Sequence, residues 1–197
     1  MKAAPLVKSF IRRFQDEGAF ILKEIFENAV KGRAFEYAVI STSVINFSPE
    51  LYKACEANAC GRYNKSWTCP PASGTLEEQR EKILAFSHAL VFTTKGELED
   101  SFDYEGMTEA KVVHDRLCAG IHEQFGSEYP FYGAGGCTIC KPCAYPQPCR
   151  FPEKIFSSIE AAGINVTDLS RAGGIRYNNG KNTITYFSMI LFNEGHP

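Results

Sequence analysis

Apolar residues recur every three or four positions in several parts of the chain, the spacing that gives a helix one hydrophobic face. Capping residues agree with this pattern, because Thr75 and Pro152 suit helix starts and Gly18 and Gly163 suit helix ends. The helices expected on these grounds cover residues 5–16, 20–30, 75–86, 108–125 and 152–162.

Other segments are rich in β-branched and aromatic residues and are expected to form strands. These segments cover residues 35–41, 89–94, 129–133, 164–168 and 183–192, and Asn178-Asn179-Gly180 predicts a turn before the last of them. A chain of 197 residues with 44% apolar residues is long enough for one sizeable core. We therefore expect a single α+β (or α/β) domain over residues 1–197, with one mixed central sheet flanked by helices.

Two stretches interrupt the regular pattern. Residues 46–74 and 133–150 are rich in Gly, Pro and Cys, and neither shows a clear apolar period. Long irregular segments inside a compact domain usually carry function. Residues 1–45 are expected to supply N-terminal helices and the first strand, and the two cysteine-rich loops are expected to pack together on one side of the sheet.

Charge and hydropathy exclude several classes of protein. The 21 Lys and Arg residues against 23 Asp and Glu residues give a formal net charge of −2, which argues against a dedicated nucleic-acid binder. No apolar run approaches the roughly 18 residues that cross a bilayer, and Met1 to Pro5 do not begin a signal peptide. We expect a cytoplasmic protein without nucleic-acid or membrane partners; the sequence leaves the oligomeric state open.

Cysteine is the main chemical feature of the sequence. Eight cysteines are too few for a disulfide-stapled protein of this length, and the cytoplasm keeps thiols reduced, so clustered cysteines indicate a metal. Four of them form a C-x2-C-x2-C-x5-C run at Cys137, Cys140, Cys143 and Cys149. This spacing is typical of a loop around a 4Fe-4S cluster, because closely spaced thiolates can each bind a different iron. A zinc ion is usually held by two pairs of ligands with a longer spacer between them.

A second group, Cys55, Cys60 and Cys69, lies upstream of the run. Cys118 lies instead on the apolar face of the expected 108–125 helix, where a free cysteine usually packs as a small hydrophobe. The remaining cysteines form groups of four and three, which suggests two clusters, one of them with an iron that is open or bound by another residue. Ligation by Cys118 would remove that open position. The pairing stays open, because the last cysteine of the run can serve the upstream group.

Four motifs surround these cysteines: Cys60–Pro71 (CGRYNKSWTCPP), Gly136–Cys143 (GCTICKPC), Pro148–Lys154 (PCRFPEK) and Ser158–Val166 (SIEAAGINV). Together they resemble an uncharacterised family described as predicted metal-binding protein, over roughly residues 50–170. The resemblance implies a metal site made from the cysteines, and it brings no agreed reaction.

These patterns favour a 4Fe-4S protein that works in electron transfer or as a redox enzyme. Its partner would be an electron donor or acceptor protein or a small-molecule substrate. The competing interpretations are a zinc-stabilised interaction module, which the chain length disfavours, and an accessory factor that delivers a metal or cluster. The four histidines form no metal-spaced pair and are expected in structural or surface roles: His88, His114, His122 and His196.

Overall fold

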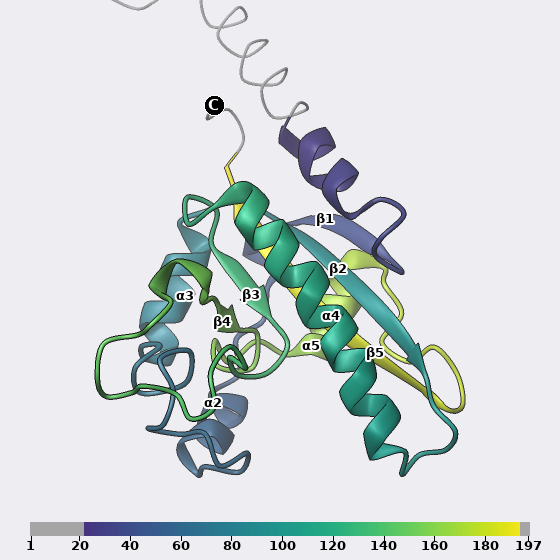
Figure 1. The fold of residues 1–197 in the computed structure, drawn as a ribbon. Helices are drawn as coiled ribbons and strands as arrows, with labels where there is room; N and C mark the ends of the chain where they lie inside the picture. The colour runs from purple at the N-terminus through teal and green to yellow at the C-terminus, as the bar shows by residue number, and fades with distance from the viewer. Residues whose placement is uncertain (1–21, 194–197) are drawn as a thin grey trace, which may run out of the picture.

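The computed structural model describes residues 22–193 and shows an α+β fold built on one mixed five-stranded sheet (Figure 1). The strands are β1 (Tyr37–Ser41), β2 (His88–Glu97), β3 (Phe131–Gly133), β4 (Ser157–Ser158) and β5 (Thr183–Phe192), in the order β1-β2-β5-β3-β4. The β3–β4 pair is parallel, and the other pairs are antiparallel. The predicted fold class is therefore confirmed.

The two long strands β2 and β5 pair at the centre of the sheet, and their side chains are buried on both of its faces. They pair from His88 opposite Phe192 to Glu97 opposite Thr183. Because successive side chains point to opposite faces, their apolar residues divide between two hydrophobic clusters. The molecule thus has one core on each side of the sheet.

Helices cover both faces (Figure 1). The helix α4 (Tyr104–Phe125) packs Leu117 and Ile121 on one side, where the described helical residues 22–30 also contribute to the core. The helices α3 (Leu76–Leu84) and α5 (Val166–Gly173) contribute to the core on the other side. No helix within residues 22–193 is long and apolar enough to span a membrane.

Most of the expected helices are present. Thr75 and Glu78 form the capping box that starts α3. The α4 helix begins earlier than predicted because the Asp103 side chain accepts a hydrogen bond from the Gly106 N–H. The expected helix over residues 5–16 lies outside the described residues.

The expected strand over residues 164–168 is wrong. The α5 helix occupies most of this stretch because the Asn165 side chain accepts hydrogen bonds from the N–H groups of Thr167 and Asp168. Only Ile164 pairs in an isolated bridge, with Phe47. The fifth strand of the sheet is β4 instead.

The expected helix over residues 152–162 is also wrong. A single 3-10 turn, η2 (Pro152–Lys154), forms without a side-chain cap, and the chain then extends into β4. Phe156 packs on Gly133, where an added Cβ would lie 2.6 Å from the ring. This contact with the sheet overrides the helical spacing.

The expected irregular stretch over residues 46–74 contains one regular element. The helix α2 (Pro49–Glu56) begins after Ser48, whose side chain accepts a hydrogen bond from the Leu51 N–H, and Pro49 occupies its first turn. Cys55 therefore lies on a helix, Cys60 lies on the turn that follows it, and Cys69 lies on a bend further along.

Candidate metal centre

The four cysteines of the C-x2-C-x2-C-x5-C run line one pocket at the surface. They are Cys137, Cys140, Cys143 and Cys149, and they share the pocket with Ser66, Trp67, Thr68, Ile139, Phe151 and Ile155. The loop that carries them connects β3 to η2 and lies between β3 and β4, the two strands at one edge of the sheet. The fold therefore gathers at one place four residues that are distributed over a loop without regular structure.

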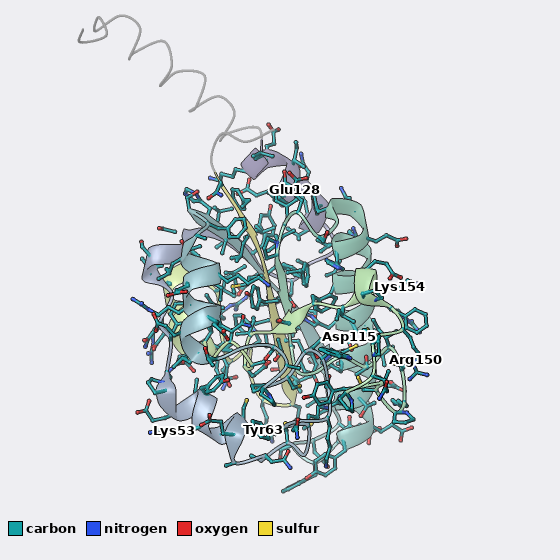
Figure 2. All side chains as sticks on the ribbon, turned by 90° about the vertical axis from the view of Figure 1, so that its left-hand side faces the viewer. Lys53, Tyr63, Asp115, Glu128, Arg150 and Lys154 are labelled. Atoms are coloured by element: carbon teal, nitrogen blue, oxygen red, sulfur yellow. The ribbon has the colours of Figure 1, made fainter. Side chains whose placement is uncertain are left out.

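The upstream cysteine segment forms one wall of this pocket. The Thr68 hydroxyl accepts a hydrogen bond from the Cys137 N–H at 3.0 Å, and the Arg62 guanidinium donates to the Cys137 carbonyl at 3.0 Å. The Trp67 indole N–H donates to the Gln147 carbonyl at 2.9 Å. Figure 2 views this side of the molecule. The two cysteine-bearing segments therefore lie against each other, although they are far apart in sequence.

Cys55, Cys60 and Cys69 form a second group. Burial raises the pKa of the Cys55 thiol, and the neighbouring thiols of Cys60 and Cys69 and the Glu160 carboxylate raise it further. The three thiols are therefore close enough for their charges to interact. Cys69 lies beside the loop of the first group, because a Cβ added at Gly136 would be 3.2 Å from its sulfur.

The thiols of the pocket oppose one another's ionisation. Burial raises the pKa of the Cys137 thiol, and the thiols of Cys140, Cys143 and Cys149 raise it further. A bound metal reverses this balance, because its positive charge deprotonates the thiols that coordinate it. Metal binding in this pocket would therefore release protons.

Cys143 differs because backbone N–H groups point at its sulfur. Burial raises its pKa, but hydrogen bonds from the N–H groups of the next two residues and of Trp67, and from the Ser66 hydroxyl, lower the pKa of Cys143 below its usual value. The Cys149 sulfur accepts a further hydrogen bond from the Phe151 N–H at 3.4 Å. Hydrogen bonds of this kind to cysteine sulfur help to set the reduction potential of iron–sulfur clusters.

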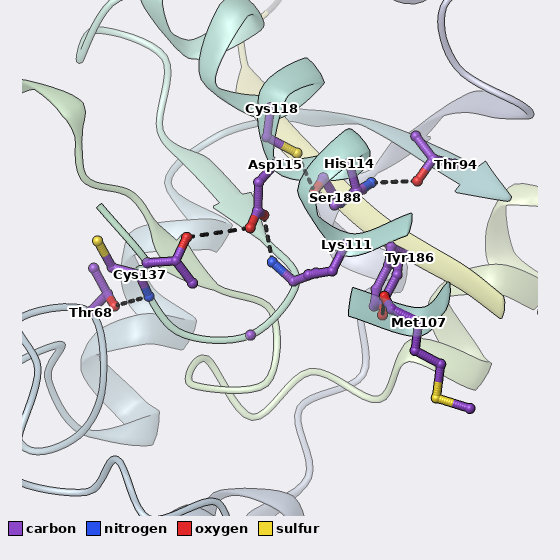
Figure 3. A network of polar contacts seen from close by, with 12 residues as sticks. Thr68, Thr94, Met107, Lys111, His114, Asp115, Cys118, Cys137, Tyr186 and Ser188 are labelled. Atoms are coloured by element: carbon purple, nitrogen blue, oxygen red, sulfur yellow. Dashed lines mark hydrogen bonds and ion pairs between the residues drawn. The ribbon is translucent and has the colours of Figure 1, made fainter. Parts of the chain in front are cut away.

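A polar network joins the pocket to α4 (Figure 3). The Thr138 hydroxyl donates to Asp115 at 3.4 Å, and Asp115 forms an ion pair with Lys111 one helical turn away. Both charged side chains are partly buried, with exposed fractions of 29% for Asp115 and 21% for Lys111. The loop is therefore tied to a helix that packs on the sheet.

Cys118 lies away from both groups, in the core between α4 and the sheet. It is fully buried, and its sulfur lies 3.1 Å from the Ser188 hydroxyl, which also contacts His114 (Figure 3). Burial raises the pKa of the Cys118 thiol to about 12. The interpretation of Cys118 as a core residue is confirmed, and the structural role expected for His114 is confirmed with it.

All eight cysteines carry free thiols. Among residues 22–193, no three His, Cys, Asp or Glu side chains are arranged to hold a metal ion as they stand. The ligand set therefore stays a prediction that rests on the pocket and on the chemistry of its side chains.

The sequence interpretation missed the supporting residues Arg62, Ser66, Thr68 and Glu160. Glu160 contacts both groups, since the Cys55 thiol donates to its carbonyl at 3.8 Å and its carboxylate accepts a hydrogen bond from the Gly135 N–H at 2.9 Å. In the sequence, the one sign of this support was the pair Ser66 and Thr68, because hydroxyl side chains shortly before a cysteine can form hydrogen bonds with the backbone of its loop.

Comparison with known proteins identifies the family of the chain. Residues 38–192 match the family described as predicted metal-binding protein (DUF2284), a stretch that contains every cysteine and runs from β1 to β5. No curated protein and no solved structure shows significant similarity to the chain. The chain therefore belongs to the DUF2284 family of predicted metal-binding proteins.

Proposed function

We propose that Cys137, Cys140, Cys143 and Cys149 hold a 4Fe-4S cluster and that the protein works in electron transfer or as a redox enzyme. The observation that carries the proposal is the shared pocket of these four residues. Their free thiols are soft ligands, which select iron–sulfur clusters or zinc over hard cations such as magnesium and calcium.

The surroundings of the four sulfurs fit an iron–sulfur cluster. Backbone N–H groups are directed at the sulfurs of Cys143 and Cys149. Ile139, Phe151 and Ile155 give the pocket apolar walls, which limit the access of water. When bound, such a cluster supplies one-electron transfer, while the residues of this chain hold it, shield it and set its potential.

We propose a second cluster at Cys55, Cys60 and Cys69. Three cysteines leave one iron to be bound by another residue or to stay open for a small molecule, and an open iron can act as a Lewis acid. Arg62 supports both groups, because it donates to the Cys137 carbonyl and its positive charge acts against the rise in the pKa of Cys69 that burial causes.

The two hydrophobic cores argue against a zinc site whose only role is to stabilise the fold. The two hydrophobic clusters described above contain none of the seven candidate ligand cysteines. Both clusters lie on the faces of the sheet, and neither includes a residue from 48–74 or 134–155. A structural metal is needed mainly where a small domain lacks such a core.

The experiment is metal analysis of protein purified without oxygen, with two cysteine variants. We expect iron and acid-labile sulfide together with visible absorption that dithionite bleaches. Cys143→Ser should lose much of this absorption, whereas the matched control Cys118→Ser should keep it. Colourless wild-type protein with stoichiometric zinc would overturn the proposal, and so would equal loss of iron in both variants.

A further inference from the structure

The chain around Cys60, Cys69 and the four pocket cysteines contains basic residues and no acidic ones. Residues 57–76 include Arg62 and Lys65, and residues 134–152 include Lys141 and Arg150, with no Asp or Glu in either stretch. The whole chain has the opposite balance, 23 acidic against 21 basic residues. Positive charge is therefore concentrated at the part of the surface that holds the candidate centre.

The basic side chains border the pocket and are open to solvent. Lys141 and Arg150 are both exposed, and the Arg150 guanidinium donates to the Pro142 carbonyl inside the loop. Lys154 is also exposed, and its ammonium lies 5.5 Å from the centre of the Phe151 ring, which lines the pocket. Arg150 and Lys154 lie along the same edge of the molecule in Figure 2.

Acidic groups near this surface remove only part of its charge. Asp115 is paired with Lys111. Glu153 and Glu160 are exposed, and Glu160 accepts a hydrogen bond from the Gly135 N–H. Glu56, beside Cys55, is exposed as well, so three carboxylates stand against the five positive charges of Arg62, Lys65, Lys141, Arg150 and Lys154. The surface around the pocket therefore keeps a net positive charge.

An apolar side chain lies among these cations. Ile139 lines the pocket, and 45% of its surface is exposed to solvent. An apolar centre with a charged margin is typical of a protein–protein interface. A surface that bound only phosphate groups would have no use for an exposed isoleucine, and the net negative charge of the chain disfavours a polyanion.

We propose that this surface, the basic rim of Lys65, Lys141, Arg150 and Lys154 around Ile139, docks a small acidic electron-transfer protein. The proposal rests on the proposed function, because such a partner is useful only where the pocket holds a redox centre. Opposite charges would steer the partner to the pocket and orient it there. Exposed charges are screened by salt, so the complex should weaken as the ionic strength rises.

The test uses the full chain, purified without oxygen and loaded with its metal, and oxidised flavodoxin as the acidic probe. Flavodoxin carries FMN and no iron, so it does not disturb the metal analysis. Calorimetric titration at low and at high salt should show a Kd that rises about tenfold or more between the two conditions. The double variant Lys141→Glu, Lys154→Glu should weaken binding at low salt by a similar factor.

The matched control is Lys82→Glu, which reverses an exposed charge on α3 and should leave the Kd unchanged. Iron, sulfide and visible absorption should be the same in all three proteins. If wild-type protein lacks iron and sulfide, the proposed function fails and the docking proposal fails with it. If iron is retained but charge reversal and salt do not change the Kd, or if a DNA oligonucleotide binds more tightly than flavodoxin, docking alone is overturned.

Discussion

The hydrogen bond between Thr68 and Cys137 joins the two cysteine segments, and its removal tests how the pocket is held. The Thr68 hydroxyl accepts from the Cys137 N–H at 3.0 Å, and Thr68 is only 2% exposed. Valine has nearly the same shape as threonine and lacks the acceptor. Thr68→Val should therefore leave a backbone N–H without a partner and allow the Cys137 loop to open more often.

The expected size of this effect follows from the burial of the bond. A buried donor that loses its partner costs about 1–3 kcal/mol. Because the Cys137 N–H is partly buried, we expect a cost of about 1–2 kcal/mol, which is a factor of about 5–30 in the opening equilibrium. Burial raises the pKa of Cys69 and the Thr68 hydroxyl lowers it, so the variant should also raise the pKa of that thiol.

Hydrogen exchange measured by mass spectrometry on reduced, metal-free protein reports this opening directly. The amide of Cys137 should exchange about 5–30 times faster in Thr68→Val than in wild type. Thr68→Ser keeps the acceptor and should exchange at nearly the wild-type rate. Unchanged protection of Cys137 in Thr68→Val, or equal loss of protection in both variants, would refute the reasoning.

Three other positions give testable expectations. Gly136→Ala places a Cβ 2.9 Å from Arg62 Cδ, so the free energy of unfolding in urea should fall by about 1–3 kcal/mol and metal content with it; unchanged values would contradict the close approach. Cys118→Ala should cost about 1 kcal/mol and leave metal content unchanged, whereas loss of metal would identify Cys118 as a ligand. Burial, together with Lys111, lowers the pKa of His114 to about 3 from 6.5, so below pH 6.5 the unfolded chain binds the proton that the folded protein excludes. The stability contributed by His114 is therefore complete above pH 6.5 and is lost as the pH falls, by about 2 kcal/mol at pH 5. A free energy of unfolding in urea that does not fall between pH 7 and pH 5 would contradict this.

The sequence predicts best the elements whose pattern is long and regular. The β5 strand was expected over residues 183–192 and spans Thr183–Phe192. The α3 and α4 helices follow from their apolar spacing and their capping residues. In each case many positions repeat the same signal, so one exceptional residue does not change the outcome.

The errors fall in residues 152–168, where the elements are short. Pro152 and the spacing after it suit a helix, but the contact of Phe156 with Gly133 and the pairing of β4 with β3 require an extended chain. Asn165 could have signalled the start of α5, but Ile164 and Val166 resemble the alternation of a strand. Tertiary contacts decide between such weak local preferences.

The candidate site was predictable in its cysteines and not in its supporting contacts. Spacing showed a run of four cysteines and an upstream set of three, and left open which set Cys149 serves. In the structure all four cysteines of the run line one pocket. In the upstream segment, Ser66 and Thr68 are buried and line the pocket, although no apolar period marks this stretch. Contacts between distant segments depend on their packing, which no local pattern encodes.

The central claim, that the cysteine pocket holds iron, is tested most directly by anomalous scattering at the iron absorption edge from crystals of protein prepared without oxygen. The account predicts a compact group of iron peaks bonded to the sulfurs of Cys137, Cys140, Cys143 and Cys149, and a second group beside Cys55. A single zinc peak in the pocket, or iron bound away from these cysteines, would contradict it.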